Sequence, residues 1–331
     1  MNDMNRTGVG SIPRRIEVLF MRFVGIVFGL TLLPAFASAQ TLFEERFENA
    51  NFASRGWIDN TTLSLSTVEH IPGSVSSLEY HWQVGATNPT NGGSARHLFT
   101  AIDTVYISYW VKYSANWVGQ NQVSFGHHEF YVLTDQDIDF SGLARTHLTA
   151  YIEENLGVGQ LALQDALNID EGNINVDLRG FTENRAVAGC NGTYPDGYSV
   201  FSCYVDGVGP HNNVKLWQTG VVFNSTPGST RYKNDWHHIE VVLNMNTIVG
   251  GIAQANGVMQ YWYDGQLLIN SQNVVYRTGQ RPTMRWHNFI MAPYMGQGSP
   301  VSQSMWIDDL VVATARPTTV PAAPTNLRVL Q

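Results

Sequence analysis

Apolar and polar residues alternate one by one along much of the chain, which is the pattern of β-strands that bury one face. The segment 105–112 (VYISYWVK) is an example: Val105 and Ile107 share one face, and Tyr106 and Ser108 share the other. No long segment repeats its apolar residues with the 3.6-residue period of a helix. The pattern therefore predicts a protein made almost entirely of strands.

Turn signals separate these strands and indicate how two of them pair. The alternating runs 258–263 and 266–269 flank Asp264–Gly265, a dipeptide that predicts a hairpin between such runs. Further strands are expected at 42–47, 63–69, 78–83, 129–133, 147–153, 236–245, 289–294 and 305–313. So many short strands predict an all-β fold, a two-sheet antiparallel β-sandwich.

The first 39 residues have the pattern of an export signal. Arg14, Arg15 and Arg22 precede an apolar run at 23–33, and residues 37–39 (ASA) form a small-residue cleavage site. The apolar run is too short to span a bilayer comfortably. We therefore interpret 1–39 as a signal peptide that is removed, and not as a membrane anchor.

Removal of this signal leaves a mature chain that begins at Gln40. Met21 is an alternative start, since residues 21–39 form a complete signal peptide by themselves. We expect a secreted or periplasmic protein with no membrane span after cleavage. Residues 40–315 are expected to form the sandwich, followed by a Pro/Thr-rich tail at 316–331 whose PAAPTNLRV resembles the start of a fibronectin type III module.

The charge of the chain excludes some functions. The whole chain has a net charge of -8 and 14% charged residues, and the mature part keeps 15 basic and 25 acidic residues. A nucleic-acid-binding protein needs a basic face, which this balance does not provide. With 44% hydrophobic residues the chain can fill a real core, so it is not disordered. The sequence carries no signal for an oligomeric state.

The chain has two cysteines, Cys190 and Cys203. In an exported protein they are expected to form a disulfide that closes the loop between them. Two free thiols or a pair of metal ligands are the alternatives. One disulfide cannot be the main stabiliser of a chain of this length, so the apolar core must be.

Four segments, taken in order, resemble parts of the concanavalin A-like (laminin G-like) jelly rolls. They are 42–57 (LFEERFENANFASRGW), 236–245 (WHHIEVVLNM), 257–269 (GVMQYWYDGQLLI) and 305–317 (MWIDDLVVATARP). The resemblance covers most of 41–315 and implies that the first and last strands lie side by side, with the Tyr-x-Asp-Gly hairpin at a sheet edge. This superfamily includes polysaccharide lyases and glycan-binding modules, and the central part of the chain also resembles secreted bacterial proteins of unassigned chemistry.

The chain departs from two families of this fold. Laminarinase-type hydrolases carry Glu-x-Asp-x-x-Glu on one strand, and nothing in the sequence matches that motif. Certain alginate lyases carry an Arg-[Ser/Thr]-Glu strand and a Gln-Ile-His strand, and neither occurs. Membership in those particular families is therefore not expected, and the reaction must be argued from the residues themselves.

Two strands carry stripes of chemically active side chains. Since residues i, i+2 and i+4 share a face, the segment HHEFYVL places His127, Glu129 and Tyr131 together and His128 on the opposite face.

The segment THLTAYIEE places His147, Tyr151 and Glu153 together, with Leu148 and Ile152 toward the core. A His, Tyr and carboxylate stripe suits the concave face of a glycan-binding jelly roll, because tyrosine rings stack on sugars and His or Glu can move protons.

The stripes suit β-elimination, in which a base removes the C5 proton of a uronate while another group neutralises its carboxylate. The candidate bases are Tyr151, His147 and His127. The candidate substrate-binding residues are Tyr131, Arg96, Arg145 and Gln164. We therefore expect a secreted protein that acts on polysaccharide, with lyase chemistry as the first hypothesis.

Three other interpretations remain open. The protein can be a non-catalytic carbohydrate-binding module or cell-surface protein. It can be a glycoside hydrolase that uses Glu129 and Glu153 as its carboxylate pair. The stripes can also be an ordinary solvated sheet face.

The resemblance also implies a structural Ca²⁺ that clamps the first and last strands, with Glu45, Asn49 and Asp308 as ligands. No organic cofactor is expected.

Overall fold

The computed structural model describes residues 39–120, 127–137, 147–164, 212 and 216–318, with only the backbone of His127. The predicted signal peptide up to residue 38, Arg145, the cysteines Cys190 and Cys203, and the tail from 319 lie outside these residues. The described elements are β1 (Thr41–Glu45), η1 (Phe52–Arg55), β2 (Trp57–Asp59), β3 (Ser64–Ser66), β4 (Ser77–Trp82), β5 (Ala95–Ile102), β6 (Thr104–Tyr113), β7 (His127–Thr134), β8 (Thr149–Asn155), β9 (Val158–Gln164), β10 (Leu216–Val221), β11 (His237–Asn244), β12 (Ile248–Val249), β13 (Ile252–Ala253), β14 (Gly257–Tyr263), β15 (Gln266–Val274), β16 (Trp286–Met295) and β17 (Gln303–Ala313).

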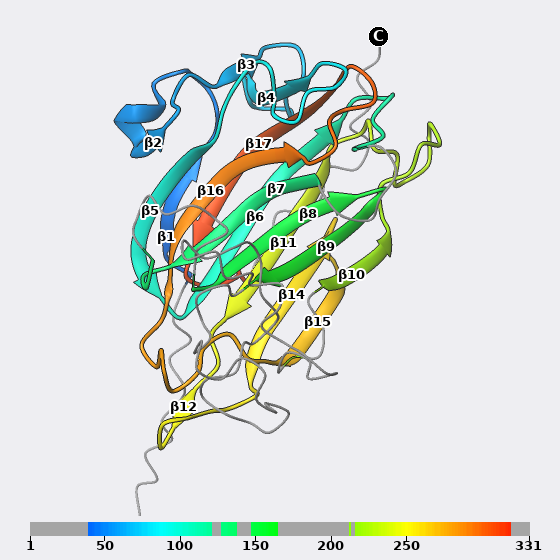
Figure 1. Ribbon diagram of the computed structural model, residues 1–331. Helices are drawn as coiled ribbons and strands as arrows, with labels where there is room; N and C mark the ends of the chain where they lie inside the picture. Colours follow the sequence, from blue (N-terminus) through cyan, green and yellow to red (C-terminus); the bar gives the residue numbers. More distant parts are fainter. Residues whose placement is uncertain (1–38, 121–126, 138–146, 165–211, 213–215, 319–331) are drawn as a thin grey trace, which may run out of the picture. The chain divides into compact units, whose positions relative to one another are not determined.

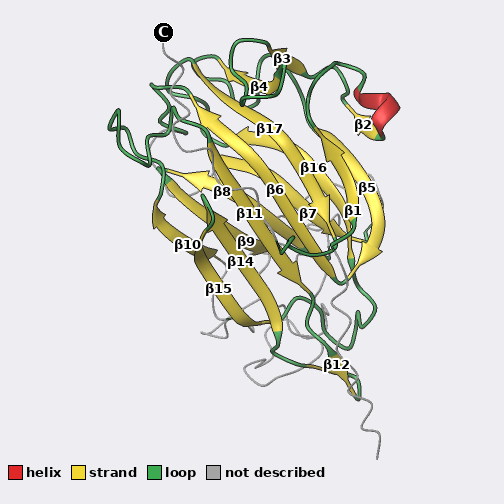
Figure 2. Cartoon of the chain, turned by 180° about the vertical axis from the view of Figure 1, so that it is seen from behind, coloured by secondary structure: helices red, strands yellow, loops and turns green. Residues whose placement is uncertain are grey.

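The strands form two large antiparallel sheets, so the predicted all-β sandwich is confirmed. An eight-stranded sheet has the order β15-β14-β11-β6-β17-β4-β3, with β1 paired to β17. A seven-stranded sheet has the order β10-β9-β8-β7-β16-β5-β2, and β12 and β13 form a small separate hairpin. Figure 1 looks onto the seven-stranded sheet, and Figure 2 looks onto the eight-stranded sheet from behind.

The first and last described strands lie side by side, as the resemblance implies. Thr41 pairs with Ala313 and Glu45 pairs with Leu310 in antiparallel register. The predicted hairpin is also present, because β14 and β15 pair across Asp264–Gly265 and β15 lies at the edge of its sheet. Both turn residues have positive φ, 48° and 76°, as a tight hairpin turn requires.

The inner faces of the two sheets enclose one large apolar core. On β6, Val105, Ile107, Tyr109 and Val111 point inward and are fully buried, as their alternation predicts. Each such aliphatic side chain contributes about 1.5–3 kcal/mol when it leaves water. Tyr106 points to the outer face of the same sheet, where it packs in a separate small cluster.

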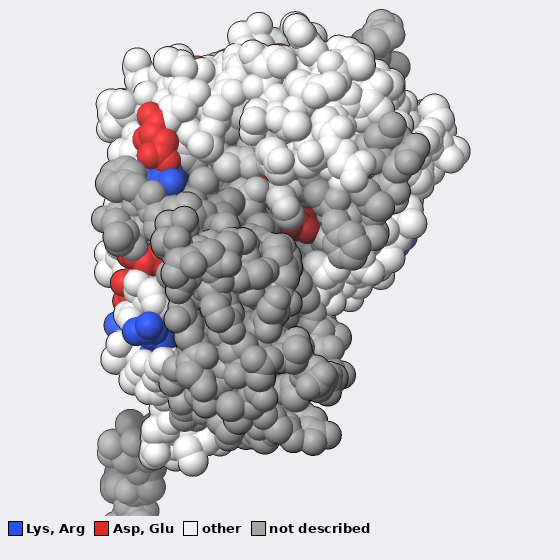
Figure 3. Space-filling model, viewed as in Figure 1, with Lys and Arg blue, Asp and Glu red and all other residues white. Residues whose placement is uncertain are grey.

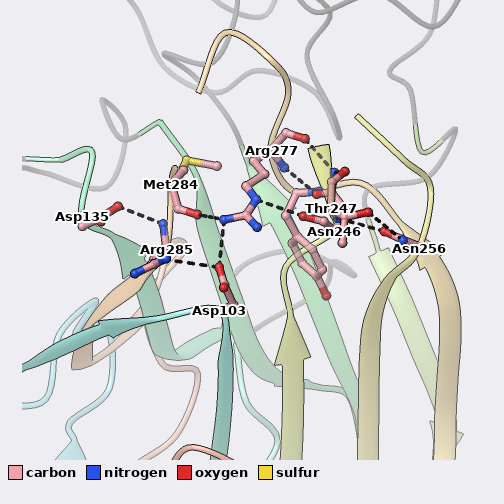
Figure 4. A network of polar contacts seen from close by, with 9 residues as sticks. Asp103, Asp135, Asn246, Thr247, Asn256, Arg277, Met284 and Arg285 are labelled. Carbon is pink, nitrogen blue, oxygen red and sulfur yellow. Dashed lines mark hydrogen bonds and ion pairs between the residues drawn. The ribbon is translucent and has the colours of Figure 1, made fainter. Parts of the chain in front are cut away.

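A buried arginine ties together the loops at one end of the sandwich (Figure 4). The guanidinium of Arg277 donates to the carbonyl oxygens of Asn246 and Met284, at 2.9 and 2.7 Å, and to Oδ1 of Asp103 at 2.9 Å. Arg285 lies 3.6 Å from the same carboxylate and hydrogen-bonds Asp135 through its backbone N–H. These loops precede β6 and β16 and follow β11, so the network stabilises connections in both sheets.

The chain beyond β17 is held by a second arginine on the outer face of the eight-stranded sheet. Arg316 donates through Nε and Nη2 to the two oxygens of Glu240, each at 3.0 Å, and its guanidinium lies 4.6 Å from the ring centre of Trp262. Tyr106 donates a third hydrogen bond to Glu240, which is fully buried. Arg316 therefore supplies the positive charge that a buried carboxylate needs.

Replacing Arg316 with Ala is expected to lower the free energy of unfolding by about 2–3 kcal/mol, because Glu240 would keep its buried charge without a cation. Arg316→Lys should recover only part of this loss, since lysine cannot form the two-oxygen contact. Chemical denaturation measures the effect. A chain that ends at Arg316 is the matched control and should stay within about 0.5 kcal/mol of the full chain. Equal stability of Arg316→Ala and the intact chain would contradict the assignment.

Candidate functional site

Two neighbouring rows of side chains cross the outer face of the seven-stranded sheet. Cross-strand partners point to the same side of a sheet, so each row is read from the pairing register. The first row is Tyr294, His128, Glu153, Gln160 and Gln218, on β16, β7, β8, β9 and β10. The second row is Arg96, Ile290, Tyr131, Tyr151 and Ala162, on β5, β16, β7, β8 and β9.

The centre of the first row is a histidine–carboxylate pair. Nδ1 of His128 hydrogen-bonds Oε1 of Glu153, and the Gln160 amide donates to the other carboxylate oxygen. An ionised carboxylate can only accept hydrogen bonds, so Nδ1 is the ring nitrogen that carries the proton. The lone pair of the neutral ring is then on Nε2. Of His128, Glu153 and Gln160, only His128 is accessible, with 28% of its side chain exposed, whereas Glu153 and Gln160 are buried. His128 is thus placed to accept a proton from a bound molecule.

Two tyrosines stand next to this pair. The ring centres of Tyr131 and Tyr151 lie 5.0 Å apart, and that of His128 lies 5.8 and 5.0 Å from them. Tyr151 donates its hydroxyl hydrogen bond to Oε1 of Gln164. Burial raises the pKa of Tyr131 well above its usual value, and the nearby Tyr151 and Glu153 raise it further. Tyr131 therefore keeps its proton at neutral pH.

The three rings line one cavity of about 550 Å³. Its other walls come from the loop between β4 and β5 and from β16, and the full lining is Asn88, Pro89, Gly93, Ser94, His128, Tyr131, Tyr151, Ala292, Pro293 and Tyr294. The cavity is lined mainly by apolar and aromatic atoms with a few polar groups, which is the usual character of a site for a small molecule or a sugar unit.

A β-bulge in β7 corrects the predicted faces of this strand. The pairing of β7 with β8 shifts between His128 and Phe130, so one extra residue is accommodated there. Simple alternation, which placed Glu129 beside Tyr131 and His128 opposite, is therefore wrong at this point. His128 faces the cavity, whereas Glu129 is buried and accepts a hydrogen bond from the Tyr113 hydroxyl on the eight-stranded sheet.

Glu129 belongs to a polar cluster inside the sandwich. Burial raises its pKa well above the usual value, and the Tyr113 hydrogen bond opposes this shift in part. Glu154 is also buried, and it accepts hydrogen bonds from Nε1 of Trp117 at 2.9 Å and from the Gly157 N–H. The ammonium of Lys233 lies near Glu154 and donates to the carbonyl of Trp117 and, at 2.8 Å, to Ser225. The cluster is satisfied within the protein and does not face the cavity.

Replacing Glu129 with Gln is expected to change how stability depends on pH. The pKa of Glu129 is higher in the folded chain than its usual value of 4.5, so the folded state binds more protons and the wild type loses stability as pH rises above that value. Glu129→Gln resembles the protonated acid and should give a flatter curve of unfolding free energy between about pH 5 and pH 8. Parallel curves for the two proteins would contradict this assignment of Glu129.

The other predicted site residues are dispersed. His147 lies just before β8, where its Nδ1 is 2.9 Å from Oδ1 of Asp137, and it does not line the cavity. Arg96 is in the second row but forms an ion pair with Asp59 at 2.5 Å. The backbone of His127 pairs with Met295, and Arg145 lies outside the described residues.

The three predicted calcium ligands form hydrogen bonds with other groups of the protein. Glu45 accepts hydrogen bonds from the Phe47 N–H, Nε of Arg55 and Nε1 of Trp57, at 2.8, 2.7 and 2.9 Å. Oδ1 of Asn49 accepts from Nη1 of Arg55 at 2.7 Å. Arg55 thus supplies the positive charge beside both groups.

Asp308, the third predicted ligand, accepts hydrogen bonds from the Ile71 N–H, the Ser74 hydroxyl and the Asp309 N–H. Burial raises its pKa to about 7. These contacts do not favour one ion held by Glu45, Asn49 and Asp308 together. Among the described residues, no three His, Cys, Asp or Glu side chains are grouped so that they could hold a metal. Calcium binding stays a prediction.

Sequence reasoning missed His128, Tyr294 and Gln160 as site residues. Gln160 could have been found, because Gln160 and Gln164 alternate with the core residues Leu161 and Leu163. His128 could not, since nothing in the sequence marks the bulge that turns it outward.

Few charged side chains of the described residues are visible on the side of the molecule that carries the site, and most of them lie near one edge (Figure 3). Within the described part of the chain, no helix has the length and apolar character needed to cross a membrane.

No protein-family model matches the sequence, and no curated protein matches it. Among solved structures, the chain is similar to an alginate lyase from Chlorella virus, with a TM-score of 0.52 and 12% sequence identity over 84% of this chain and 100% of that one. It is also similar to an endo-β-1,4-glucuronan lyase from the fungus Trichoderma reesei, with a TM-score of 0.49 and 12% identity over 83% and 96% of the two chains. A third is the PL-14 alginate lyase from Aplysia kurodai, with a TM-score of 0.49 and 13% identity over 84% and 100%.

At this level of identity the likeness to the Chlorella virus enzyme establishes the fold. The protein is a jelly-roll β-sandwich, as predicted, and the alginate lyase from Chlorella virus shares this architecture.

Proposed function

We propose that this protein is a polysaccharide lyase that cleaves a uronate-containing glycan by β-elimination. The observation that carries the proposal is the His128–Glu153 pair, which lies beside the rings of Tyr131 and Tyr151 at one cavity. A proton acceptor, proton donors and an aromatic surface for a sugar are thereby brought within reach of the same bound unit.

In this reaction His128 is the base. Its Nε2 takes the proton from C5 of the uronate, and Glu153 holds Nδ1 and stabilises the imidazolium that forms. The electron pair of the broken C5–H bond becomes the C4–C5 double bond. The C4–O bond to the neighbouring sugar breaks, and the departing oxygen takes up a proton.

Tyr131 is suited to donate that proton, because its raised pKa keeps it protonated until the leaving oxygen becomes basic. Gln164, which accepts the hydrogen bond of the Tyr151 hydroxyl, does not line the cavity, so we do not assign it to the uronate carboxylate. Arg96 lies in the same row as Tyr131, two strands away, and can add positive charge there.

The geometry supports the hydrolase alternative less well. Glu129 and Glu153 would have to flank one glycosidic bond, but Glu129 faces the interior and Glu153 faces the outer side of the sheet. A non-catalytic carbohydrate-binding module is the second candidate, because rings and amides on a sheet face also bind sugars without reaction.

Export to the periplasm or medium is part of the proposal. It is supported by the basic residues, apolar run and cleavage site at 1–39. Such a compartment also supports the proposed disulfide between Cys190 and Cys203.

Replacing His128 with Asn is expected to lower kcat by about 10²- to 10⁴-fold, because the base is removed. The measurement is the rise in ultraviolet absorbance from unsaturated products during incubation with alginate, polyglucuronate and gellan, in each of which a sugar is joined to O4 of a uronate. His70→Asn, a histidine outside the cavity, is the control and should keep full turnover. New reducing ends without unsaturated products would indicate a hydrolase. Retardation in polymer-containing gels without any product would indicate a binding module.

The two neighbouring carboxylates provide a matched pair of variants. Glu153→Gln should lower kcat by at least about tenfold, because the His128 tautomer and the imidazolium lose their support. Glu129→Gln should stay within about threefold of the wild type, since Glu129 contacts Tyr113 in the interior. The same absorbance assay compares them. Equal losses of kcat in both variants would contradict the assignment of Glu153 as the partner of His128 and of Glu129 as an interior residue without a part in the reaction.

A further inference from the structure

A second hollow lies at the edge of the sandwich, away from the cavity at His128. It is formed where β10, the edge strand of the seven-stranded sheet, contacts β15, the edge strand of the eight-stranded sheet. The hollow, here called the edge groove, has a volume of about 420 Å³ and is lined by Trp217, Gln218, Leu268, Ile269, Asn270, Ser271, Gln272 and Asn273.

The edge groove has the chemistry of a sugar site. Trp217 and Leu268 are only partly buried where they pack against the core, so they form an apolar base. Amide side chains form most of the remaining lining, and Asn270 is held in place because its Oδ1 accepts hydrogen bonds from Gln260 at 2.9 Å and Gln272 at 2.6 Å. An aromatic ring with ordered amides matches the faces and hydroxyl groups of a sugar.

Among the described residues, none of the side chains that line the edge groove carries a charge. A carboxylate bound there would lose water without gaining a cation, which is unfavourable. A hydroxyl-rich, uncharged sugar does not meet this penalty, because the amides replace its hydrogen bonds to water.

The edge groove is continuous with the row that contains His128. Gln218 lines the groove, and its Nε2 donates to Oε1 of Gln160 at 3.0 Å. Gln160 in turn donates to Glu153, the partner of His128. Three strand spacings separate His128 from Gln218, a distance of ~14 Å. Between His128 and Gln218 this row holds Glu153 and Gln160, both of which are buried, so a glycan that reaches both places meets the row at His128 and at Gln218.

We propose that the edge groove binds uncharged sugar units of the same glycan chain whose uronate unit is cleaved at His128. The substrate is then a heteropolymer in which a uronate is joined to neutral sugars, and not a polymer of uronates alone. This inference rests on the proposed function for the identity of the cleaved unit, but binding of neutral glycan in the groove can be tested without catalysis.

The test compares three proteins: the wild type, the double variant Asn270→Ala/Gln272→Ala, and the control Gln266→Ala. Gln266 is an exposed amide of the same strand that does not line the groove. Native gels that contain hydroxyethylcellulose, galactomannan or arabinoxylan report binding of neutral glycan. Turnover of gellan, whose backbone joins a 4-linked glucuronate to neutral sugars, and of alginate, followed by absorbance of unsaturated products, reports catalysis.

At least one neutral polymer should retard the wild type and the control, and the double variant should lose this retardation by about fivefold or more. On gellan the double variant should show a KM raised by about 5- to 10-fold with kcat within twofold, and on alginate no such change. The proposal that the edge groove binds neutral sugars would be overturned if no neutral polymer retarded the wild type. It would also be overturned if the KM values of the double variant were unchanged. If retardation depends on Asn270 and Gln272 but no uronate polymer gives a product, the edge groove is a sugar-binding site and the proposed lyase activity is rejected.

Discussion

Each long strand of a two-sheet sandwich must turn one face toward a shared apolar core, and this constraint decides where the protein can place its chemistry. On β7 the inward positions are Phe130 and Val132, so strict alternation would also send His128 inward. The bulge between His128 and Phe130 removes this conflict by adding one residue to the strand. His128 is thereby free to meet Glu153, and the rest of the candidate site is arranged around that contact.

The bulge has an energetic cost, which is that Glu129 enters the core. Two features limit this cost: the Tyr113 hydroxyl hydrogen-bonds the carboxyl group, and burial raises the pKa of that group, which favours its uncharged form. Glu154 nearby is handled differently, since the indole of Trp117 and the charge of Lys233 stabilise it. Buried polar groups of this kind are tolerated only when they are satisfied, which explains why both acids have specific partners.

The sequence was sufficient for the architecture because the architecture follows from local signals. Alternation marked β6, β11 and β17, and Asp264–Gly265 marked the hairpin of β14 and β15. β10 escaped prediction because its sequence, LWQTGV, includes a glycine and few inward apolar residues. The site was predicted only in part. Tyr131, Tyr151 and Glu153 were found from their stripes, but their true partner was assigned to the wrong face, since a bulge depends on the register with a neighbouring strand and leaves no mark in one segment.

The rows across the seven-stranded sheet also show why pattern reading along one strand could not assemble the site. Tyr294, His128, Glu153 and Gln218 are far apart in sequence and become neighbours only through strand order. A row of this kind runs perpendicular to the strands, so it takes one side chain from each strand in turn. Strand order, and not any single motif, sets which groups become neighbours in the row.

The Arg316 contact has a consequence for anything joined to the end of this domain. Arg316 is fastened to Glu240 and Trp262 on the outer face of the eight-stranded sheet, whereas the cavity at His128 opens on the outer face of the other sheet. A module fused after this residue, or a surface to which the tail is coupled, would begin on the side remote from the cavity. A tether at Arg316 would therefore leave the domain from the face opposite to the one that carries the cavity.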